Sequence, residues 1–473
     1  MSLNHHDSIP LEEKVDIKTK LCYAVGSFGS YTVFTIFLNS VIIFYREKLL
    51  LQSSSILYAF TLYTILNAIN GVIFGWISDR TRTRKGRRIP YLKYLAPFLA
   101  LSFILIWISP LTREIGELGV FFWLLLTMIF FDICYNTTNM AYSALGQELS
   151  MDNKERVNIQ VYIMIFGIFS TLISLILPLS FLEDPGREGF IIFVVLLALI
   201  QLLTMWITAF TIKERLEFSQ IDEPLGIIES FRYTIRNKSF LSTVFVNFCV
   251  GFVQAVIFGN IFFFINYIYI NYPSALILAL IGIFLLSGLF LGTIFLLKLN
   301  KARGLKYTLL RSLAIIGIGL IMIGVLPDIF ATFGFFLFGF GLFGFMGLPN
   351  TALGAVADED EVNTGTRREA AIFGVSALIT KPAQSLAGLF IALILLLFQY
   401  QEPINGVQQP QSVFTLLGFR LGMGIIPGII VLVSVYVFSF YPLYGEYLVE
   451  IKIKMYDIHE EKKKKLESLK IKN

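Results

Sequence analysis

Long apolar stretches and short polar segments alternate along this 473-residue chain. A helix that crosses a bilayer needs roughly 20 mainly apolar residues, and it satisfies its own backbone hydrogen bonds in lipid. We find twelve such stretches and predict a membrane-spanning helix at each. The predicted spans are residues 20–45, 53–77, 90–110, 118–147, 156–182, 188–212, 238–270, 275–298, 305–327, 329–356, 369–399 and 412–440.

The composition indicates the same class of protein. Hydrophobic residues make up 56% of the chain, charged residues only 15%, and the mean hydropathy is +0.73. These values are too apolar for a soluble domain. The first apolar run follows a polar, charged segment, so we expect a true span and not a cleavable signal peptide. The predicted fold class is an all-α membrane protein with twelve transmembrane helices in two pseudo-symmetric six-helix bundles.

Basic residues predict which loops face the cytoplasm, because cytoplasmic loops carry the excess of Lys and Arg. The loop after the second span holds six of them between Arg80 and Arg88, whereas the loop at 399–411 holds none. Both termini are therefore expected to be cytoplasmic, in a protein of the cell membrane. The predicted divisions are a tail at 1–19, a first bundle at 20–212, a linker at 213–237, a second bundle at 238–445 and a basic tail at 446–473.

A short internal repeat favours two related halves. Residues 143–146 read Ser-Ala-Leu-Gly at the end of the fourth span, and residues 351–354 read Thr-Ala-Leu-Gly at the end of the tenth. Repeated halves are typical of alternating-access transporters, in which one half moves against the other around a site near the midplane.

The net charge and the positions of the cysteines and histidines exclude several kinds of partner and site. Much of the net charge of +5 comes from the loops and from the tail at 459–473, which we expect to be solvated or to touch lipid headgroups. No nucleic-acid partner follows from it. The three cysteines lie in spans without metal-site spacing, and the three histidines lie in the tails. We therefore expect no metal, no cofactor and no intramembrane catalytic cluster, and hence no enzyme.

Polar residues recur with helical spacing inside several spans. Such stripes either bond helices to one another, at about 0.6 to 2 kcal/mol per contact, or line a cavity for a solute. The stripe residues are Asp132, Tyr135, Asn136, Asn139 and Ser143 on the fourth span, Tyr63, Asn67 and Asn70 on the second, Thr243, Asn247 and Gln254 on the seventh, and Thr380, Lys381 and Gln384 on the eleventh.

Asp132 and Lys381 place ionisable groups deep in predicted spans. A charge at this depth costs several kcal/mol and is a candidate functional group by default. Lys381 follows Glu369 by twelve residues, which is about 18 Å along a helix, too far for its stem to reach the interface. A direct or water-bridged pair of Asp132 and Lys381 would neutralise both. A purely structural ion pair and a protonated Asp132 stay open, and substrate or proton handling is the preferred interpretation.

Charges of both signs also gather at the predicted cytoplasmic ends of the helices, where pairs could hold the outward-open state closed from inside. Exposed pairs are individually worth little, and a network is expected to shift the balance of states by about 1 to 2 kcal/mol. Arg80→Ala or Asp358→Asn is predicted to favour the inward-open state. The candidate gate residues are Asp79, Arg80, Arg84, Glu148, Arg156, Asp358, Arg367 and Arg368.

Three segments carry a family resemblance: CYAVGSFG at 22–29, GWISDRTRTRKGRRIPY at 75–91 and ADEDEVNTGTRREAAIFGV at 357–375. They resemble the glycoside-pentoside-hexuronide:cation symporter family, the melibiose-carrier branch of the major facilitator superfamily. The match runs from about residue 20 to residue 445. It implies two six-helix bundles around a central cavity and, in typical members, sodium- or proton-coupled uptake of a sugar.

The resemblance also implies roles for single residues. Lys381 falls on a helix 11 lysine that borders the family's cation site. Members that couple to sodium carry acidic residues where this chain has Tyr31, Asn67, Gly71 and Asn139. A cation in the membrane interior needs an anionic oxygen ligand, so we expect the usual sodium site to be absent. Facilitated diffusion, or proton coupling through Asp132 and Lys381, is then predicted.

A sugar is the first expectation for the substrate, because aromatic and amide side chains are common in sugar cavities. Candidate groups are Tyr31, Tyr135, Tyr142, Asn139 and Asn247. A lysolipid, a small organic anion balanced by Lys381 and an amino-acid-like solute stay open as substrates. A receptor-like member without flux is a further alternative, and we expect a monomer.

Overall fold

The structure is a computed structural model that describes residues 14–83, 86–182, 188–214, 227–401 and 409–472, and within these ranges all regular elements are helical. Each of the twelve predicted spans coincides with helix. In the part of the chain that the structure describes, eight stretches are long and apolar enough to cross a membrane, and two shorter apolar helices accompany them. The fold class is therefore that of an all-α membrane protein, as the apolar runs predict.

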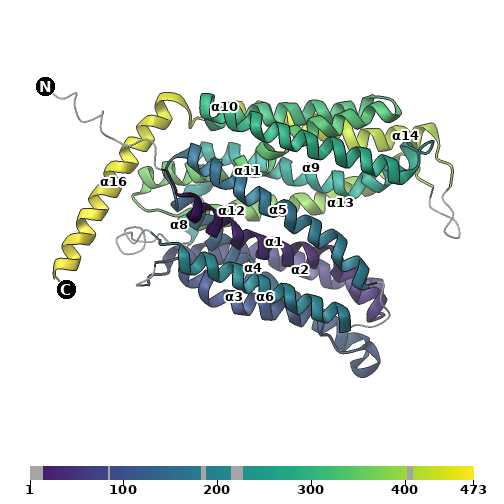
Figure 1. Cartoon of the computed structure of the whole chain (residues 1–473), viewed down its shortest axis with the longest axis horizontal. Helices are drawn as coiled ribbons and strands as arrows, with labels where there is room; N and C mark the ends of the chain where they lie inside the picture. The colour runs from purple at the N-terminus through teal and green to yellow at the C-terminus, as the bar shows by residue number, and fades with distance from the viewer. Residues whose placement is uncertain (1–13, 84–85, 183–187, 215–226, 402–408, 473) are drawn as a thin grey trace. The chain divides into compact units, whose positions relative to one another are not determined.

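The chain forms two compact units. The first consists of Met1–Thr234, Ala357–Leu378 and Ile451–Asn473, and the second of Ile235–Val356 and Ile379–Glu450. Figure 1 labels the main helices along the chain. The division into bundles and linker at 213–237 stays a prediction.

The first unit is built on six long helices. α1 packs against α5 and α6, α3 packs against α4 and α6, and α2 packs against α4. A π-helical turn, η2 (Phe44–Lys48), extends α1, and α8 (Ile227–Arg236) follows the six. Their bounds are α1 (Ile17–Ile43), α2 (Ser53–Arg80), α3 (Ile89–Trp107), α4 (Thr112–Glu148), α5 (Asn153–Leu182) and α6 (Glu188–Thr211).

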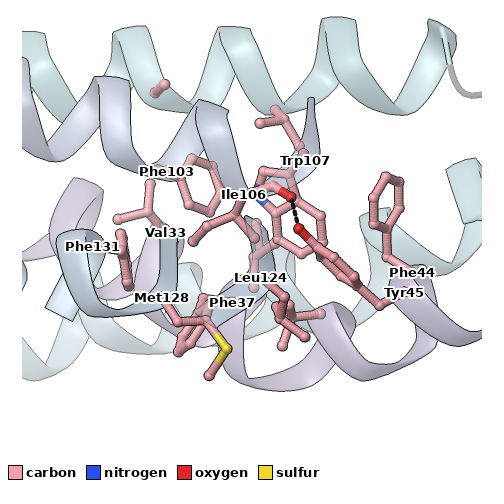
Figure 2. Packing of buried hydrophobic residues seen from close by; sticks show 14 of the residues in the cluster. Val33, Phe37, Phe44, Tyr45, Phe103, Ile106, Trp107, Leu124, Met128 and Phe131 are labelled. Atoms are coloured by element: carbon pink, nitrogen blue, oxygen red, sulfur yellow. Dashed lines mark hydrogen bonds between the residues drawn. The ribbon is translucent and has the colours of Figure 1, made fainter. Parts of the chain in front are cut away.

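Aromatic side chains fill the core between these helices, as Figure 2 shows. The ring of Trp107 meets those of Phe44 and Phe103 edge-on. The hydroxyl of Tyr45 donates a hydrogen bond to the carbonyl oxygen of Ile106 at 2.7 Å. The buried hydroxyl group of Tyr45 thus has a hydrogen-bond partner, without which its burial would be costly.

The second unit contains α9 (Lys238–Ile268), α10 (Ser274–Val325), the 3-10 turn η3 (Asp328–Ala331) and most of α11 (Thr332–Thr364). Two predicted spans, at 275–298 and 305–327, both fall in α10. Gly304 separates them with φ +79°, a conformation that glycine adopts without a Cβ clash. The last span, at 412–440, consists of α14 (Val413–Arg420), the π-helical turn η4 (Leu421–Ile425) and α15 (Ile426–Ser439).

The structure corrects the prediction of one continuous helix at 369–399. It contains α12 (Glu369–Thr380) and α13 (Pro382–Leu397), and Lys381 lies at the break between them. Pro382 has no N–H to donate to the preceding turn, which accounts for the interruption. Most of the basic tail forms the long helix α16 (Gly445–Lys472), yellow in Figure 1. The expectation of a solvated segment at 459–473 does not hold for His459 and Lys462, which are buried.

Candidate functional site

Asp132 on α4 accepts hydrogen bonds from two side chains of α2. The hydroxyl of Tyr63 donates to Oδ1 at 3.1 Å, and Nδ2 of Asn70 donates to Oδ2 at 2.7 Å. Asp132 is only 2% exposed. Each carboxylate oxygen therefore has a neutral donor, and hydrogen bonds to an ionised acceptor are about twice as strong as neutral ones.

Two further amides extend this arrangement. Nδ2 of Asn67 donates to the Tyr63 hydroxyl at 3.1 Å, and Nδ2 of Asn136 donates to Oδ1 of Asn67 at 3.3 Å. Every link donates toward Asp132, which suits an acceptor-only carboxylate at the end of the chain. We call these five residues the intramembrane polar cluster: Tyr63, Asn67, Asn70, Asp132 and Asn136.

Aromatic rings border the intramembrane polar cluster. Tyr135 stacks on Phe34 with ring centroids 4.3 Å apart, and Phe37 meets Tyr63 edge-on at 5.9 Å. Tyr135 and Tyr63 are buried. An apolar border keeps the local dielectric low, which strengthens the hydrogen bonds inside it and makes any unpaired polar group costly.

Other predicted site residues of the first unit lie on α4 and on α1. Asn139 and Tyr31 are half-buried. Tyr31 packs against an apolar cluster that contains Tyr23 and Tyr142, and those two rings stack with centroids 4.3 Å apart. A role in solute binding for these side chains stays a prediction.

The predicted residues of α9 and α13 belong to the second unit. Asn247 and Gln254 are half-buried on α9, and Lys381 is half-buried at the α12–α13 break. The side chain of Gln384 lies outside the described part. Because Asp132 and Lys381 belong to different units, their pairing stays a prediction.

A second constellation lies at the helix ends of the first unit. Nη1 and Nη2 of Arg156 donate to Asp358 at 2.7 and 3.1 Å, and Nη2 of Arg367 donates to the same carboxylate at 3.1 Å. Nη1 of Arg367 also donates to Glu361 at 2.7 Å. All four side chains are at most 1% exposed. The expectation of exposed, individually weak pairs is therefore wrong here, because breaking a buried pair costs about 3 to 5 kcal/mol.

Arg87 connects two parts of this constellation. Its Nη2 donates to Oε1 of Glu148 at 2.9 Å, and its Nη1 donates to the carbonyl oxygen of Arg367 at 2.7 Å. Arg87 comes from the segment that precedes α3, Glu148 ends α4 and Arg367 precedes α12. Three chain segments are thus joined by one guanidinium group.

Asp79, the penultimate residue of α2, caps the start of α12. It accepts a hydrogen bond from Nη2 of Arg88 at 2.5 Å and from the backbone N–H groups of Ala370 and Ala371 at 3.3 and 2.6 Å. A carboxylate at a helix N-terminus satisfies orphan N–H groups and complements the helix dipole.

The remaining gate candidates differ in their surroundings. Arg368 donates to Asp360 at 2.5 and 2.7 Å, whereas Arg80 is exposed and its guanidinium lies 4.3 Å from the ring centre of Trp76. Arg84 lies outside the described residues. We define the helix-end network as Asp79, Arg87, Arg88, Glu148, Arg156, Asp358, Asp360, Glu361, Arg367, Arg368 and Glu369.

The helix α16 docks on this network and was missed by the sequence prediction. Lys452 donates to Oδ2 of Asp358 at 2.7 Å, while His459 and Lys462 contact Glu361 at 2.9 and 2.7 Å. The three basic residues lie seven and three positions apart, a spacing that puts them on one helical face. That spacing could have predicted a basic helical face. It was overlooked because the whole tail is rich in charged residues.

Glu214, just beyond α6, is a further residue that the sequence did not indicate. Its carboxylate accepts hydrogen bonds from the backbone N–H groups of Arg87, Arg88 and Ile89 at 2.7, 2.8 and 3.2 Å, and so caps α3. Burial raises the pKa of Glu214 above its ordinary value. The adjacent Gly86 has φ +107°, which brings this turn under the carboxylate.

Among the described residues, no group of three or more His, Cys, Asp and Glu side chains is placed to hold a metal ion. The intramembrane polar cluster contains one carboxyl group, that of Asp132, which can accept hydrogen bonds and exchange a proton. The helix-end network instead offers ion pairs that join helix ends.

Several known proteins are similar to this chain in sequence. An uncharacterized symporter of Synechocystis, sll1374, is 32% identical over 169 residues, which cover 35% of this chain and 31% of that protein. The isoprimeverose transporter of Lactiplantibacillus pentosus is 23% identical over 52% of this chain and 51% of its own length. A putative 2,3-dihydroxypropane-1-sulfonate exporter of Salmonella typhimurium is 23% identical over 92% of this chain and 94% of its length.

Solved structures share the fold. The E. coli fucose:proton symporter has a TM-score of 0.63 at 12% identity, covering 90% of this chain and 98% of its own. A bacterial homologue of the iron transporter ferroportin in an outward-facing state has a TM-score of 0.66 at 15% identity, covering 90% and 99%. Both are membrane transporters by their titles.

The family described as "MFS/sugar transport protein" matches residues 22–445. This match covers both predicted halves and agrees with the all-helical, multi-pass architecture. The chain therefore belongs to the MFS/sugar transport protein family, whose fold is that of membrane transporters.

Proposed function

We propose that this protein carries a sugar or glycoside across the cell membrane by alternating access, in symport with a proton bound at Asp132. The observation that carries the proposal is the pair of hydrogen bonds to the buried Asp132 carboxylate from Tyr63 and Asn70. The protein acts as a monomer and leaves the solute chemically unchanged.

A proton suits this cluster better than sodium does. The positions where sodium-coupled relatives carry further acids hold Tyr31, Asn67, Gly71 and Asn139 here. One carboxylate with amide and hydroxyl neighbours makes a weak site for a desolvated metal ion, whereas it suffices to bind and release one proton. Uptake without coupling is the outcome expected if Asp132 only ties α2 to α4.

The helix-end network supplies the gate in this proposal. The termini and the network face the cytoplasm, in accord with the positive-inside rule, and the buried pairs around Asp358 hold that side closed. Lys381 lies at a helix break in the other unit, and a broken helix suits a residue that responds to the occupied or empty site.

The sugar assignment draws on the names of relatives, among them the isoprimeverose transporter and a putative glycoside/cation symporter of E. coli. Stacked aromatic rings beside amide groups, as at Tyr135 and Asn136, are suited to a sugar ring and its hydroxyls.

A small organic anion is the second candidate substrate. The relatives named as putative 2,3-dihydroxypropane-1-sulfonate exporters match over nearly the whole chain. Lys381 is a cation at membrane depth that would balance such an anion. Lysolipids and amino-acid-like solutes have less support from these names.

Transport by the purified full chain in proteoliposomes tests the proposal. Radiolabelled pentosides, hexosides and sulfonates are offered with and without sodium and with and without an inward proton gradient. We expect uptake of a glycoside that the proton gradient drives and sodium does not. Asp132→Asn should abolish the proton dependence, whereas Asp457→Asn on the exposed face of α16 should not.

Three results would contradict this scheme. Sodium-driven uptake that survives Asp132→Asn would remove the coupling assignment, and sulfonate flux without glycoside flux would favour the anion candidate. Counterflow of no solute in the panel would indicate a receptor-like member.

A further inference from the structure

Glu148 and Glu369 form a carboxyl pair inside the helix-end network. Glu148 ends α4 and Glu369 begins α12, and their exposed fractions are 2% and 0%. The two carboxyl groups lie close enough to interact. Arg87 links them, because its guanidinium group donates to Glu148 and to the carbonyl oxygen of Arg367, and Arg367 is the ion-pair partner of Glu369. The Oε2 atom of each is buried and receives no hydrogen bond from a donor.

The other oxygen of each carboxyl group is occupied. Oε1 of Glu148 accepts from Nη2 of Arg87 at 2.9 Å and lies 3.5 Å from Nε of Arg88. Oε1 of Glu369 contacts Nη2 of Arg367. The Oε2 atom of each carboxyl group is therefore buried without a donor, while the Oε1 atoms hold the arginines.

Two carboxylates in contact in a buried site cannot both be ionised, because the like charges repel and neither is solvated. One proton between them removes the repulsion and gives both Oε2 atoms a partner. We propose that Glu148 and Glu369 share one proton when the helix-end network is assembled, and that they form a proton-binding site separate from Asp132.

The surrounding charges decide which carboxyl group carries the proton. Glu148 faces two guanidinium groups, those of Arg87 and Arg88. Glu369 faces Arg367, which is shared with Asp358 and Glu361 and so is already neutralised by other acids. The proton therefore resides on Glu369 and is donated to Glu148.

Charged groups on the other packed elements also act on this carboxyl pair, and they include both acids and bases. From α2, Asp79 takes up part of the charge of Arg88, and Glu214 beyond α6 adds negative charge beside Glu148. Tyr23 of α1 lies close enough to Glu369 to interact with it. The more distant members are Arg156 of α5 and, on α16, Lys452, His459 and Lys462, which pair with Asp358 and Glu361.

This site has a consequence for gating, which rests on the function proposed above. Parting α4 from α12 would expose both carboxyl groups to water, and the proton would leave to the cytoplasm. The closed gate then holds one proton more than the open gate. The ratio of closed to open gate falls by up to about tenfold for each unit that cytoplasmic pH rises.

Infrared spectroscopy of the full chain in detergent tests the shared proton without any need for transport. An Asp132→Asn background removes the signal of Asp132. At neutral pH this protein should show the C=O stretch of a protonated carboxyl group, and both Glu148→Gln and Glu369→Gln should remove that band. A band that persists at full intensity in both variants overturns the proposal.

If the Gln variants fail to fold, Glu148→Asp and Glu369→Asp take their place. Each keeps a carboxyl group and should shift the band, and an unshifted band in both again overturns the proposal. Because no flux is measured, a protein that transports nothing still gives a decisive spectrum, so failure of the proposed function is distinguishable from failure of this site.

Gate opening is tested by thiol labelling at Thr366→Cys, next to Arg367, after the three native cysteines are replaced by Ala. Labelling should accelerate as cytoplasmic pH rises, beyond the chemical acceleration seen in the same protein with Glu369→Gln. Equal pH dependence in the two proteins would refute the gating consequence.

Discussion

Arg156 and Asp358 lie 202 positions apart in the chain, yet they form a two-bond ion pair. Nη1 donates to Oδ2 at 2.7 Å and Nη2 donates to Oδ1 at 3.1 Å. The planar guanidinium group fits a carboxylate in this side-by-side geometry, which fixes orientation as well as distance. The pair fastens the segment Ala357–Leu378 to the helices of the first unit.

Asp358→Asn should lower stability strongly, because Arg156, Arg367 and Lys452 then share a neutral amide in place of a carboxylate. The expected loss is about 3 to 5 kcal/mol, typical of a broken buried pair. Thermal unfolding of the detergent-solubilised protein measures it. Asp457→Asn on the exposed face of α16 serves as the matched control and should leave the midpoint unchanged.

Lys452→Met should instead be neutral or stabilising at pH 7. Burial lowers the pKa of Lys452 to about 8, and the attraction of Asp358 restores only part of the loss. Keeping this lysine charged therefore opposes folding, while Asp358 retains two arginine partners. Methionine fills a similar volume without a charge. A midpoint that falls by several degrees in Lys452→Met would refute this.

The same residue gives a pH dependence with a definite sign. Between pH 8 and the ordinary lysine value of 10.5, the unfolded chain holds the Lys452 proton and the folded protein has released it. The contribution of Lys452 to the free energy of unfolding therefore rises with pH across that window. The difference in unfolding midpoint between Lys452→Met and the native chain should narrow from pH 8 to pH 10. A widening difference would show the opposite linkage.

Tyr63→Phe should destabilise the intramembrane polar cluster, because Asp132 loses one donor and Asn67 loses its acceptor. An unsatisfied buried polar group costs about 1 to 3 kcal/mol. Tyr58→Phe on the same helix is the control, since Tyr58 is 65% exposed. Equal unfolding midpoints for the two variants would mean that the Tyr63 hydroxyl contributes nothing.

Gly86→Ala should weaken the cap on α3. Besides its positive φ, an added Cβ would lie 2.3 Å from Oε2 of Glu214, so the carboxylate must move away from the N–H groups it accepts from. Gly116→Ala is the control, because Gly116 has φ +72° and open space around it. Both variants carry backbone strain, of about 1 to 3 kcal/mol for a non-glycine residue in a sparsely populated region. The clash with Glu214 adds to the loss for Gly86→Ala.

The apolar runs predicted the helices well because each run is a local property of the chain. A stretch of about 20 apolar residues can form a helix in lipid whatever its neighbours do, since a helix satisfies its backbone hydrogen bonds within the segment. The breaks were less predictable. The interruption at Lys381 depends on a single Pro382, and sequence periodicity gives it little weight.

The candidate site was predictable in part. Helical spacing put Asp132 and Asn136 on one stripe and Tyr63, Asn67 and Asn70 on another, and the packing of α2 on α4 joined the two. The docking of Lys452, His459 and Lys462 was not foreseen, because a charged tail has the same composition whether it is solvated or paired with buried acids.

The sequence by itself determined the class, most of the helices, the family and the residues that carry charge into the membrane, because composition and periodicity are local quantities. Only the tertiary structure decided which charges meet. Whether Glu148 faces water, an arginine or Glu369 depends on helix ends more than 200 residues apart, and the burial that makes such pairs energetically large exists only after the helices pack.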